Sequence, residues 1–283
     1  MPALFGPSGN SERFYNEGFK KTLDAFAWLK TLGLDCFEYP AGNGITASLA
    51  TFRALGEEAR KNHILTSFHT PYYISLSSTE LEKRQKSVEY IQKSEQAAMA
   101  LGADTLVIHT GSAAKISRSE ALTLAADTMY RTLNAIPDSS LRFGLETMGK
   151  KNQLGTLDEV ITICKLDRRL CPVIDFGHIN AREGGILRCK DDFRRIFDTV
   201  GSALGAEYVE HLHCHFSKIE YNASGERRHL TFEDTVYGPD FEPFIEAIYE
   251  EGLSPCIISE SAGTMADDAL RMKRYYQSLS ERN

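Results

Sequence analysis

Short apolar segments that resemble β-strands alternate with amphipathic segments that resemble helices eight times along the 283 residues. This alternation is typical of α/β proteins with a parallel sheet. The expected strands cover residues 4–9, 35–39, 64–69, 105–109, 141–146, 171–175, 209–218 and 255–260. The expected helices cover residues 15–32, 49–61, 79–101, 119–136, 157–164, 191–201, 241–250 and 266–279.

Eight strand–helix pairs in fewer than 300 residues predict a (β/α)8 TIM barrel. A doubly wound sheet is the alternative, but it needs a glycine-rich G-x-G-x-x-G turn after its first strand. Residues 6–9 read Gly-Pro-Ser-Gly and do not supply that turn. Because no linker, low-complexity tract or further repeat interrupts the pattern, we expect one domain over residues 1–283.

The composition disfavours several classes of protein. A formal net charge of -7 disfavours nucleic-acid binding through an overall basic field, but it permits a local basic rim or metal ions that bind phosphate. None of the six cysteines forms a C-x-x-C pair, so we expect a reducing, cytoplasmic location and no thiolate metal site. No signal-peptide pattern opens the chain and no apolar run reaches the roughly 20 residues that span a bilayer, so no membrane partner is expected.

Histidines occupy alternate positions 211, 213 and 215 of the expected seventh strand. Side chains on a strand alternate faces, so these three imidazoles are expected on one face. They would repel each other when protonated, whereas neutral imidazole is a good metal ligand. We therefore interpret the strand as part of a metal site.

Further histidines and acids stand where other expected strands end. In a TIM barrel the active site is built at the C-terminal ends of the strands. The candidate residues at or just beyond such ends are His69, His109, Glu146, Asp175, His178, His213, His215, His229 and Glu260. Nitrogen and oxygen donors without sulfur suit zinc, manganese or iron(II), and a carboxylate such as Glu146 can bridge two ions.

Several of these residues belong to motifs that follow one another along the chain. The motifs are Phe68-His69-Thr70-Pro71-Tyr72, Ile108-His109-Thr110-Gly111, Leu145-Glu146-Thr147, Gln153-Leu154-Gly155, Asp175-Phe176-Gly177-His178, His213 with Ser217-Lys218, Arg228-His229 and Ser259-Glu260. In order, spacing and residue type, this set resembles the endonuclease IV family over nearly the whole chain. That family comprises zinc-dependent apurinic/apyrimidinic endonucleases built on a TIM barrel.

The resemblance implies a site for three zinc ions, with manganese as an alternative metal. The implied ligands are His69, His109 and Glu146 for the first ion, Glu146, Asp175, His213 and Glu260 for the second, and His178 and His229 for the third. It also implies hydrolysis of the DNA backbone 5′ to an abasic site by a hydroxide that bridges two of the ions, with Glu146 and Glu260 as catalytic carboxylates.

The implied partner is damaged double-stranded DNA, and the implied role is DNA repair. Tyr72 matches a family residue that enters the DNA beside the flipped-out lesion, and Tyr73 replaces an apolar neighbour of that residue. We expect the protein to be a monomer.

Three features depart from the family pattern. Arg227 stands where the third ion's carboxylate is expected, and a guanidinium cannot ligate a cation. Either Arg227 turns outward and a water, Glu226 or His215 fills the gap, or the third ion binds weakly. We expect two tight ions and a labile third one, which Arg227→Asp would tighten. The loop 38–44 lacks the family's DNA-probing residues apart from Tyr39, and His215 is an extra candidate ligand.

Two other functions are compatible with the same residues. A sugar isomerase or epimerase of the xylose-isomerase-like superfamily would hold one divalent ion with Glu146, Asp175, His213 and Glu260, but it would leave His69, His109 and His229 without a clear task. A non-catalytic relative would only bind metal or nucleic acid. Metal content discriminates, because two or three zinc ions per chain favour the nuclease and one manganese or cobalt ion favours the isomerase.

Overall fold

The computed structural model describes residues 2–281 and contains an eight-stranded parallel sheet that curls into a barrel. Neighbouring strands follow the order β1-β10-β7-β6-β5-β4-β3-β2. The two end strands meet, because the backbone amide of Gly9 donates to the carbonyl oxygen of Glu38 and that of Asp35 donates to Phe5, both at 2.9 Å. The predicted α/β fold of the TIM-barrel type is confirmed.

The strands of the barrel are short, and a separate hairpin follows the seventh of them. The barrel strands are β1 (Leu4–Pro7), β2 (Cys36–Pro40), β3 (Leu65–His69), β4 (Thr105–His109), β5 (Arg142–Glu146), β6 (Leu170–Asp175), β7 (His213–Phe216) and β10 (Cys256–Ser259). The hairpin pairs β8 (Ile219–Asn222) with β9 (Gly225–His229).

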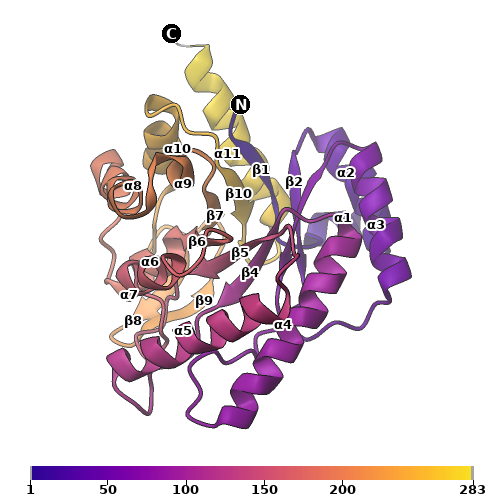
Figure 1. Ribbon diagram of the computed structural model, residues 1–283. Helices are drawn as coiled ribbons and strands as arrows, with labels where there is room; N and C mark the ends of the chain where they lie inside the picture. Colours follow the sequence, from indigo (N-terminus) through magenta and orange to yellow (C-terminus); the bar gives the residue numbers. More distant parts are fainter. Residues whose placement is uncertain (1, 282–283) are drawn as a thin grey trace.

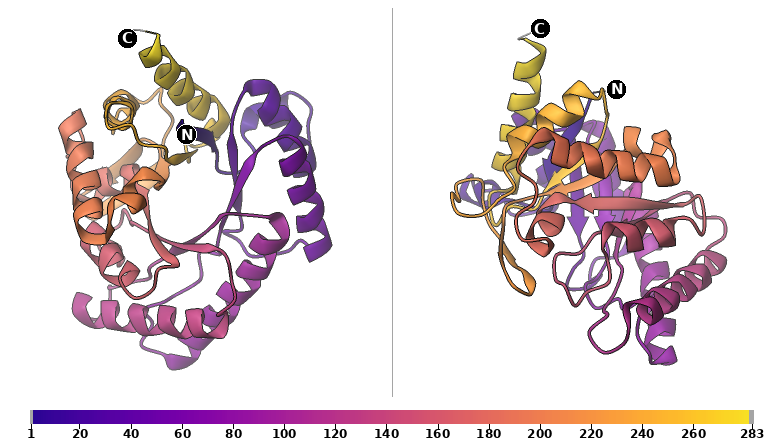
Figure 2. Two further views of the ribbon diagram at one scale, coloured as in Figure 1. Left: turned by 45° about the horizontal axis from the view of Figure 1, so that its top comes forward. Right: turned by 90° about the vertical axis from the view of Figure 1, so that its left-hand side faces the viewer.

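Helices surround the strands, as Figures 1 and 2 show. They are α1 (Glu12–Asn16), α2 (Thr22–Leu32), α3 (Leu49–Lys61), α4 (Leu81–Leu101), α5 (Arg118–Ala135), α6 (Leu157–Cys164), α7 (Phe176–Arg182), α8 (Lys190–Leu204), α9 (Ala206–Glu210), α10 (Phe241–Glu250) and α11 (Met265–Ser280). Among residues 2–281, none of these helices has the length and apolar character needed to cross a membrane.

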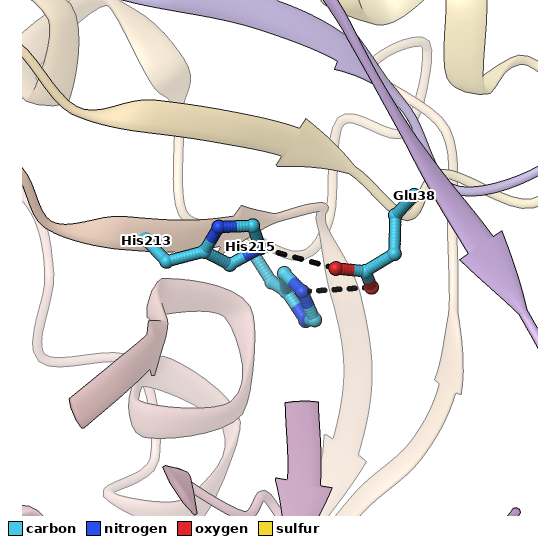
Figure 3. Close-up of side chains that lie close together, drawn as sticks. All are labelled: Glu38, His213 and His215. Atoms are coloured by element: carbon cyan, nitrogen blue, oxygen red, sulfur yellow. Dashed lines mark hydrogen bonds and ion pairs between the residues drawn. The ribbon is translucent and has the colours of Figure 1, made fainter. Parts of the chain in front are cut away.

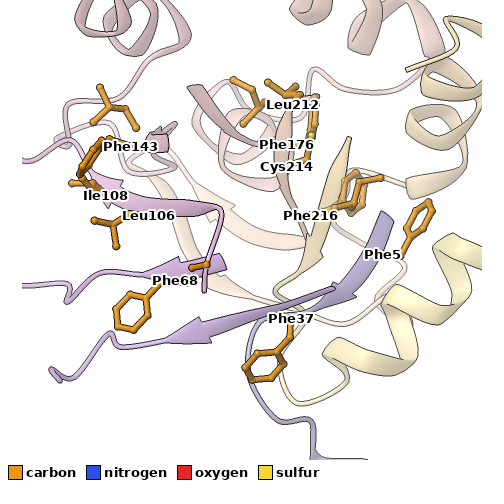
Figure 4. Close-up of a cluster of buried hydrophobic side chains, with 14 of the residues drawn as sticks. Phe5, Phe37, Phe68, Leu106, Ile108, Phe143, Phe176, Leu212, Cys214 and Phe216 are labelled. Carbon is orange, nitrogen blue, oxygen red and sulfur yellow. The ribbon is translucent and has the colours of Figure 1, made fainter. Parts of the chain in front are cut away.

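An apolar layer between strands and helices forms the core (Figure 4). Alternate residues of a strand face this layer, and the residues between them face the barrel interior. In β7, Cys214 and Phe216 are fully buried in the apolar layer. Their neighbours His213 and His215 therefore face the interior, where the polar side chains collect.

The seventh strand is shorter than the expected 209–218. Residues 206–210 form α9, which begins directly after Gly205 at φ 118°, and His211 caps its C-terminal end with a half-exposed side chain. Pairing with β6 and β10 starts only at His213. The expectation that His211 shares a face with the other two histidines was therefore wrong, since this residue lies outside the strand.

One further expectation about an element was incomplete, and one helix was not expected. The expected helix over 15–32 is two helices, α1 and α2, separated at Gly18, whose φ of 93° no helix accommodates. The segment after β6 forms the short helix α7, in which the Asp175 carboxylate caps the N-terminus by accepting from the His178 backbone amide at 2.7 Å. Both His178 and the end of β6 are thereby fixed at the barrel mouth.

Candidate metal centre

The carboxylate of Glu146 lies at the middle of the polar cluster. β4 and β5 place His109 and Glu146 opposite each other, and His109 Nε2 is 3.0 Å from Glu146 Oε2. His69 Nε2 lies 3.4 Å from the same oxygen. The other ring nitrogen of His69, Nδ1, is 2.8 Å from the carbonyl oxygen of Thr70. A proton on that nitrogen leaves Nε2 free to act as a ligand.

A second group of possible ligands shares Glu146. Asp175 and His215 are register partners on β6 and β7, and Glu260 follows β10. His215 Nδ1 lies 3.1 Å from Glu146 Oε1 and 3.6 Å from Glu260 Oε2. One ligand atom from each of Glu146, Asp175, His215 and Glu260 lies within 4.8 Å of the others.

His215 thus occupies the place in which we expected His213. The register gives the reason, because His215 lies opposite Asp175 whereas His213 lies opposite Val173, one layer deeper in the barrel. His213 Nε2 is instead 3.0 Å from Glu38 Oε2 (Figure 3). The geometry therefore groups His213 with Glu38 and not with Glu260.

A third group combines α7 with the hairpin. His178 Nε2 lies 3.4 Å from Glu226 Oε2, and the rings of His178 and His229 are 5.4 Å apart. His178 Nδ1 is 2.9 Å from the carbonyl oxygen of Thr147, and His229 Nδ1 is 2.8 Å from the Ser217 hydroxyl. These second contacts hold both rings and leave Nε2 of each facing the group.

A β-bulge explains why Glu226, and not residue 227, completes this group. In the hairpin Glu220 pairs with Arg228 and Tyr221 pairs with Glu226, so Arg227 is an extra residue without a partner of its own. One extra residue reverses the alternation of faces and brings Glu226 onto the face of His229. Arg227 turns outward, is 58% exposed and contacts Glu220 at 2.6 Å, which is the first of the two outcomes that we expected.

The three groups fit divalent metal ions. Their donors are imidazole nitrogens and carboxylate oxygens, which zinc and manganese accept. Asp175 Oδ2 is buried and accepts no hydrogen bond from the described residues, although His178 Nδ1 lies 3.3 Å away. A carboxylate oxygen without a hydrogen bond is costly in a protein interior, and coordination of a cation is one way to offset that cost.

The protonation states suit metal binding in part. At His69, His178 and His215 the neighbouring carboxylates outweigh burial and raise the pKa, so these rings must release a proton when an ion binds. Burial raises the pKa of Glu146, but the imidazoles of His109 and His215 outweigh burial and hold this pKa well below its usual range. Burial lowers the pKa of His109, which favours the neutral ring that can bind a metal. Burial raises the pKa of Asp175 to about 6, so this acid is the one whose ionisation would gain most from a nearby cation.

A cavity of about 620 Å³ opens above the three groups and is lined by His69, Tyr72, Glu146, Lys150 and Glu260, among others. Tyr72 is 60% exposed at this cavity, whereas Tyr73, which is 53% exposed, does not line it and packs against Tyr90 with ring centroids 4.8 Å apart. The Tyr72 ring lies 5.4 Å from the rings of both His69 and His109. Burial of its hydroxyl, together with the nearby carboxylate of Glu260, raises the pKa of Tyr72 to about 12, so Tyr72 is a neutral donor.

Sequence reasoning missed Glu38 and the structural role of Arg182. Glu38 follows Cys36 at a spacing of two, so the alternation in its strand could have indicated an inward-facing acid. Arg182 ends α7, is buried, and donates to the carbonyl oxygens of Met148 and Lys150 at 3.0 and 2.7 Å. It therefore braces the loop after β5 and is not available for phosphate.

The sequence of the chain is similar to that of several proteins. One is the "Uncharacterized protein MJ0133" of Methanocaldococcus jannaschii, which is 33% identical over 75% of this chain and 77% of the relative. Another is a "Probable endonuclease 4" of Acholeplasma laidlawii, which is 28% identical over 67% of this chain. The match spans 64% of that relative, which is less than two thirds of its length.

Solved structures of two kinds share the fold. A D-tagatose 3-epimerase-like protein has a TM-score of 0.70 at 21% identity, with 88% of this chain and 91% of that chain covered. Endonuclease IV from Thermus thermophilus has a TM-score of 0.67 at 16% identity, with 94% and 96% covered. The family model described as "Xylose isomerase-like TIM barrel" matches residues 26–276. The chain therefore belongs to the xylose isomerase-like TIM barrel family.

Proposed function

We propose that the protein is a metal-dependent phosphodiesterase of the endonuclease IV type that cleaves DNA on the 5′ side of abasic sites. The observation that carries this proposal is the position of Glu146. Its carboxylate is shared by two groups of possible ligands, and His178 of the third group lies 3.4 Å from it. The relatives named "Probable endonuclease 4" support the same reaction.

A site for several adjacent metal ions suits phosphodiester hydrolysis better than the isomerisation or epimerisation of a sugar. When bound, divalent ions neutralise charge on a phosphate and lower the pKa of a bound water. The residues that would hold them are the three groups around Glu146, each with ligand atoms within 4.8 Å of one another. A reaction that needs one ion would leave two of these buried groups without a role.

Other side chains at the cavity have roles in binding and proton transfer. Lys150 lines the cavity and supplies a positive charge for a DNA phosphate. Tyr72 presents an exposed aromatic ring beside His69 and His109, on which a base next to the lesion can stack. Glu260 has a side chain that is 15% exposed, so its carboxylate can reach both His215 and the cavity, where it can accept a proton.

A divalent-metal sugar epimerase is the second candidate. Glu146, Asp175, His215 and Glu260 are two glutamates, an aspartate and a histidine in one group, which would hold a single ion. The fold that this chain shares with a D-tagatose 3-epimerase-like protein supports this candidate. It assigns no task to His69, His109, His178, Glu226 or His229.

The deciding experiment uses protein whose metal content has been measured. We expect two or three zinc ions per chain, and cleavage 5′ to the lesion in a duplex that carries one abasic site. The assay is run at low salt, because contacts between basic side chains such as Lys150 and DNA phosphates weaken as salt rises. A strong chelator should abolish cleavage. An intact duplex with fully loaded enzyme, together with turnover of a ketohexose, would favour the epimerase.

A further inference from the structure

We propose that Glu38 is a positioning residue for the metal centre, whose buried carboxylate holds the His215 ring with Nδ1 turned toward Glu146 and Glu260. Figure 3 shows Glu38 facing both His213 and His215 across the barrel interior. This inference rests on the proposed metal binding, but it does not depend on DNA as the substrate.

The Glu38 carboxylate connects three strands. Its Oε1 lies 3.0 Å from His215 Nε2, and its Oε2 lies 3.0 Å from His213 Nε2. Ser67 on β3 donates its hydroxyl to Oε2 at 2.8 Å. Glu38 and His215 are both 0% exposed, so water does not screen these contacts. The carboxylate thus supports His215 from the side opposite to the cavity.

The two nitrogens of the His215 ring have separate tasks. Nδ1 faces the Glu146 carboxylate at 3.1 Å and can bind a metal only if its lone pair is free. The ring proton must then reside on Nε2, beside Glu38 Oε1. Oε1 and Nε2 are 3.0 Å apart but lie off the line of a hydrogen bond. Glu38 therefore acts on the ring mainly through its charge, which favours the proton on Nε2.

Glu38 is better placed to support a ligand than to be one. Its Oε2 already accepts from Ser67 and faces His213. A further ion among Glu38, His213 and His215 would share the His215 ring with the group around Glu146. It would also be a fourth divalent cation in the barrel interior. The five carboxylates there, including Glu38, already face the three proposed cations. Carboxylates that support a metal-binding histidine in this way typically change metal affinity about 10–100-fold.

The test is a cobalt(II) titration of metal-stripped protein, followed by visible absorption without any DNA. We expect Glu38→Gln to bind as many ions as the wild type, with the dissociation constant of one ion raised about 10–100-fold. At saturation the absorption should match that of the wild type, because the number of ligands is unchanged. His215→Ala, which removes a ligand, should instead lose one ion.

A matched control is Thr105→Val, because Thr105 lies beside Ser67 in the same interior layer and makes its side-chain hydrogen bond to Asp104. It should bind cobalt like the wild type. Loss of a whole ion in Glu38→Gln would show that Glu38 is itself a ligand, and unchanged dissociation constants would show that it positions nothing. Either result overturns the inference. If His215→Ala keeps every ion, the proposed metal centre fails instead.

Discussion

At the scale of single residues, His213 and His215 lie in different layers of the barrel interior. We therefore expect their substitution to have different effects on metal binding. His215→Ala should bind one ion fewer than the wild type, because it removes a donor that faces Glu146 and Glu260. His213→Ala should keep the number of ions, because this ring contacts Glu38. Metal analysis after dialysis measures both. The reverse result would restore the ligand set that the sequence alone suggested.

Glu260 gives a second prediction at this scale. Glu260→Gln should remove at least about 100-fold of the phosphodiesterase activity, because an amide is a poorer ligand and cannot accept a proton as a carboxylate does. The fold should survive, since an acid at a barrel strand end contributes more to chemistry than to stability. Kinetics and circular dichroism together check this. Activity within a few-fold of the wild type would exclude Glu260 from the site.

At the scale of elements, the bulge in the β8–β9 hairpin decides how the third group is built. The sequence led us to expect that Arg227→Asp tightens the third site, and the hairpin changes this prediction. Because Glu226 faces His178 and Arg227 contacts Glu220, Arg227→Asp should leave the affinity for the third ion nearly unchanged. Glu226→Gln should weaken it at least about tenfold by removing a charged ligand. Zinc titration of both variants tests the hairpin register. Tighter binding in Arg227→Asp would place residue 227 inside the site and contradict this pairing.

Helix α8 offers a prediction about pH at the same scale. The Asp192 carboxylate accepts from the backbone amides of Arg188 and Cys189 at 2.8 and 2.9 Å. These bonds lower the pKa of Asp192 to about 2, with the Arg188 amide as the largest cause. Because the pKa of Asp192 is lower in the folded state, its ionised carboxylate stabilises the fold. This stabilisation is fully present above the unfolded-state pKa of about 3.9 and is lost as the pH falls toward 2.

Asp192→Asn should therefore lower the free energy of unfolding by about 1 kcal/mol at neutral pH, a magnitude typical of a lost N-terminal cap. The difference between variant and wild type should shrink as the pH falls below 4. Urea unfolding at several pH values measures it. A difference that is constant with pH would show that the charge of Asp192 contributes nothing.

At the scale of the whole molecule, the barrel could be predicted from sequence but the details of its interior could not. The strand–helix alternation indicates the fold because each buried strand and each amphipathic helix has its own period. The pairing register does not appear in the sequence. A shift of one layer exchanges His213 for His215, and one bulge exchanges position 227 for Glu226. The extent of one domain over residues 1–283 stays a prediction.

Glu38 was missed for a related reason. Its partners His213 and His215 are about 175 positions away along the chain, and only closure of the barrel between β1 and β2 brings them together. The short helix α9 was also beyond reach, because residues 206–212 fit both a strand and a helix over so short a length. Local patterns therefore located the strand ends, whereas the contacts across the barrel needed the structure.

The last prediction concerns the stability of the whole barrel without metal. Five buried or partly buried carboxylates face its interior groups, and cations that bind only the folded state stabilise it by mass action. Free zinc at 100 times its dissociation constant should add about 2.7 kcal/mol for one site. For a chain of this size we expect a rise in Tm of about 5–10 °C over the stripped protein. Glu146→Gln, which removes the shared carboxylate, should show a much smaller rise. An equal rise in both proteins would mean that zinc binds elsewhere, and no rise in either would show that the interior groups do not hold it.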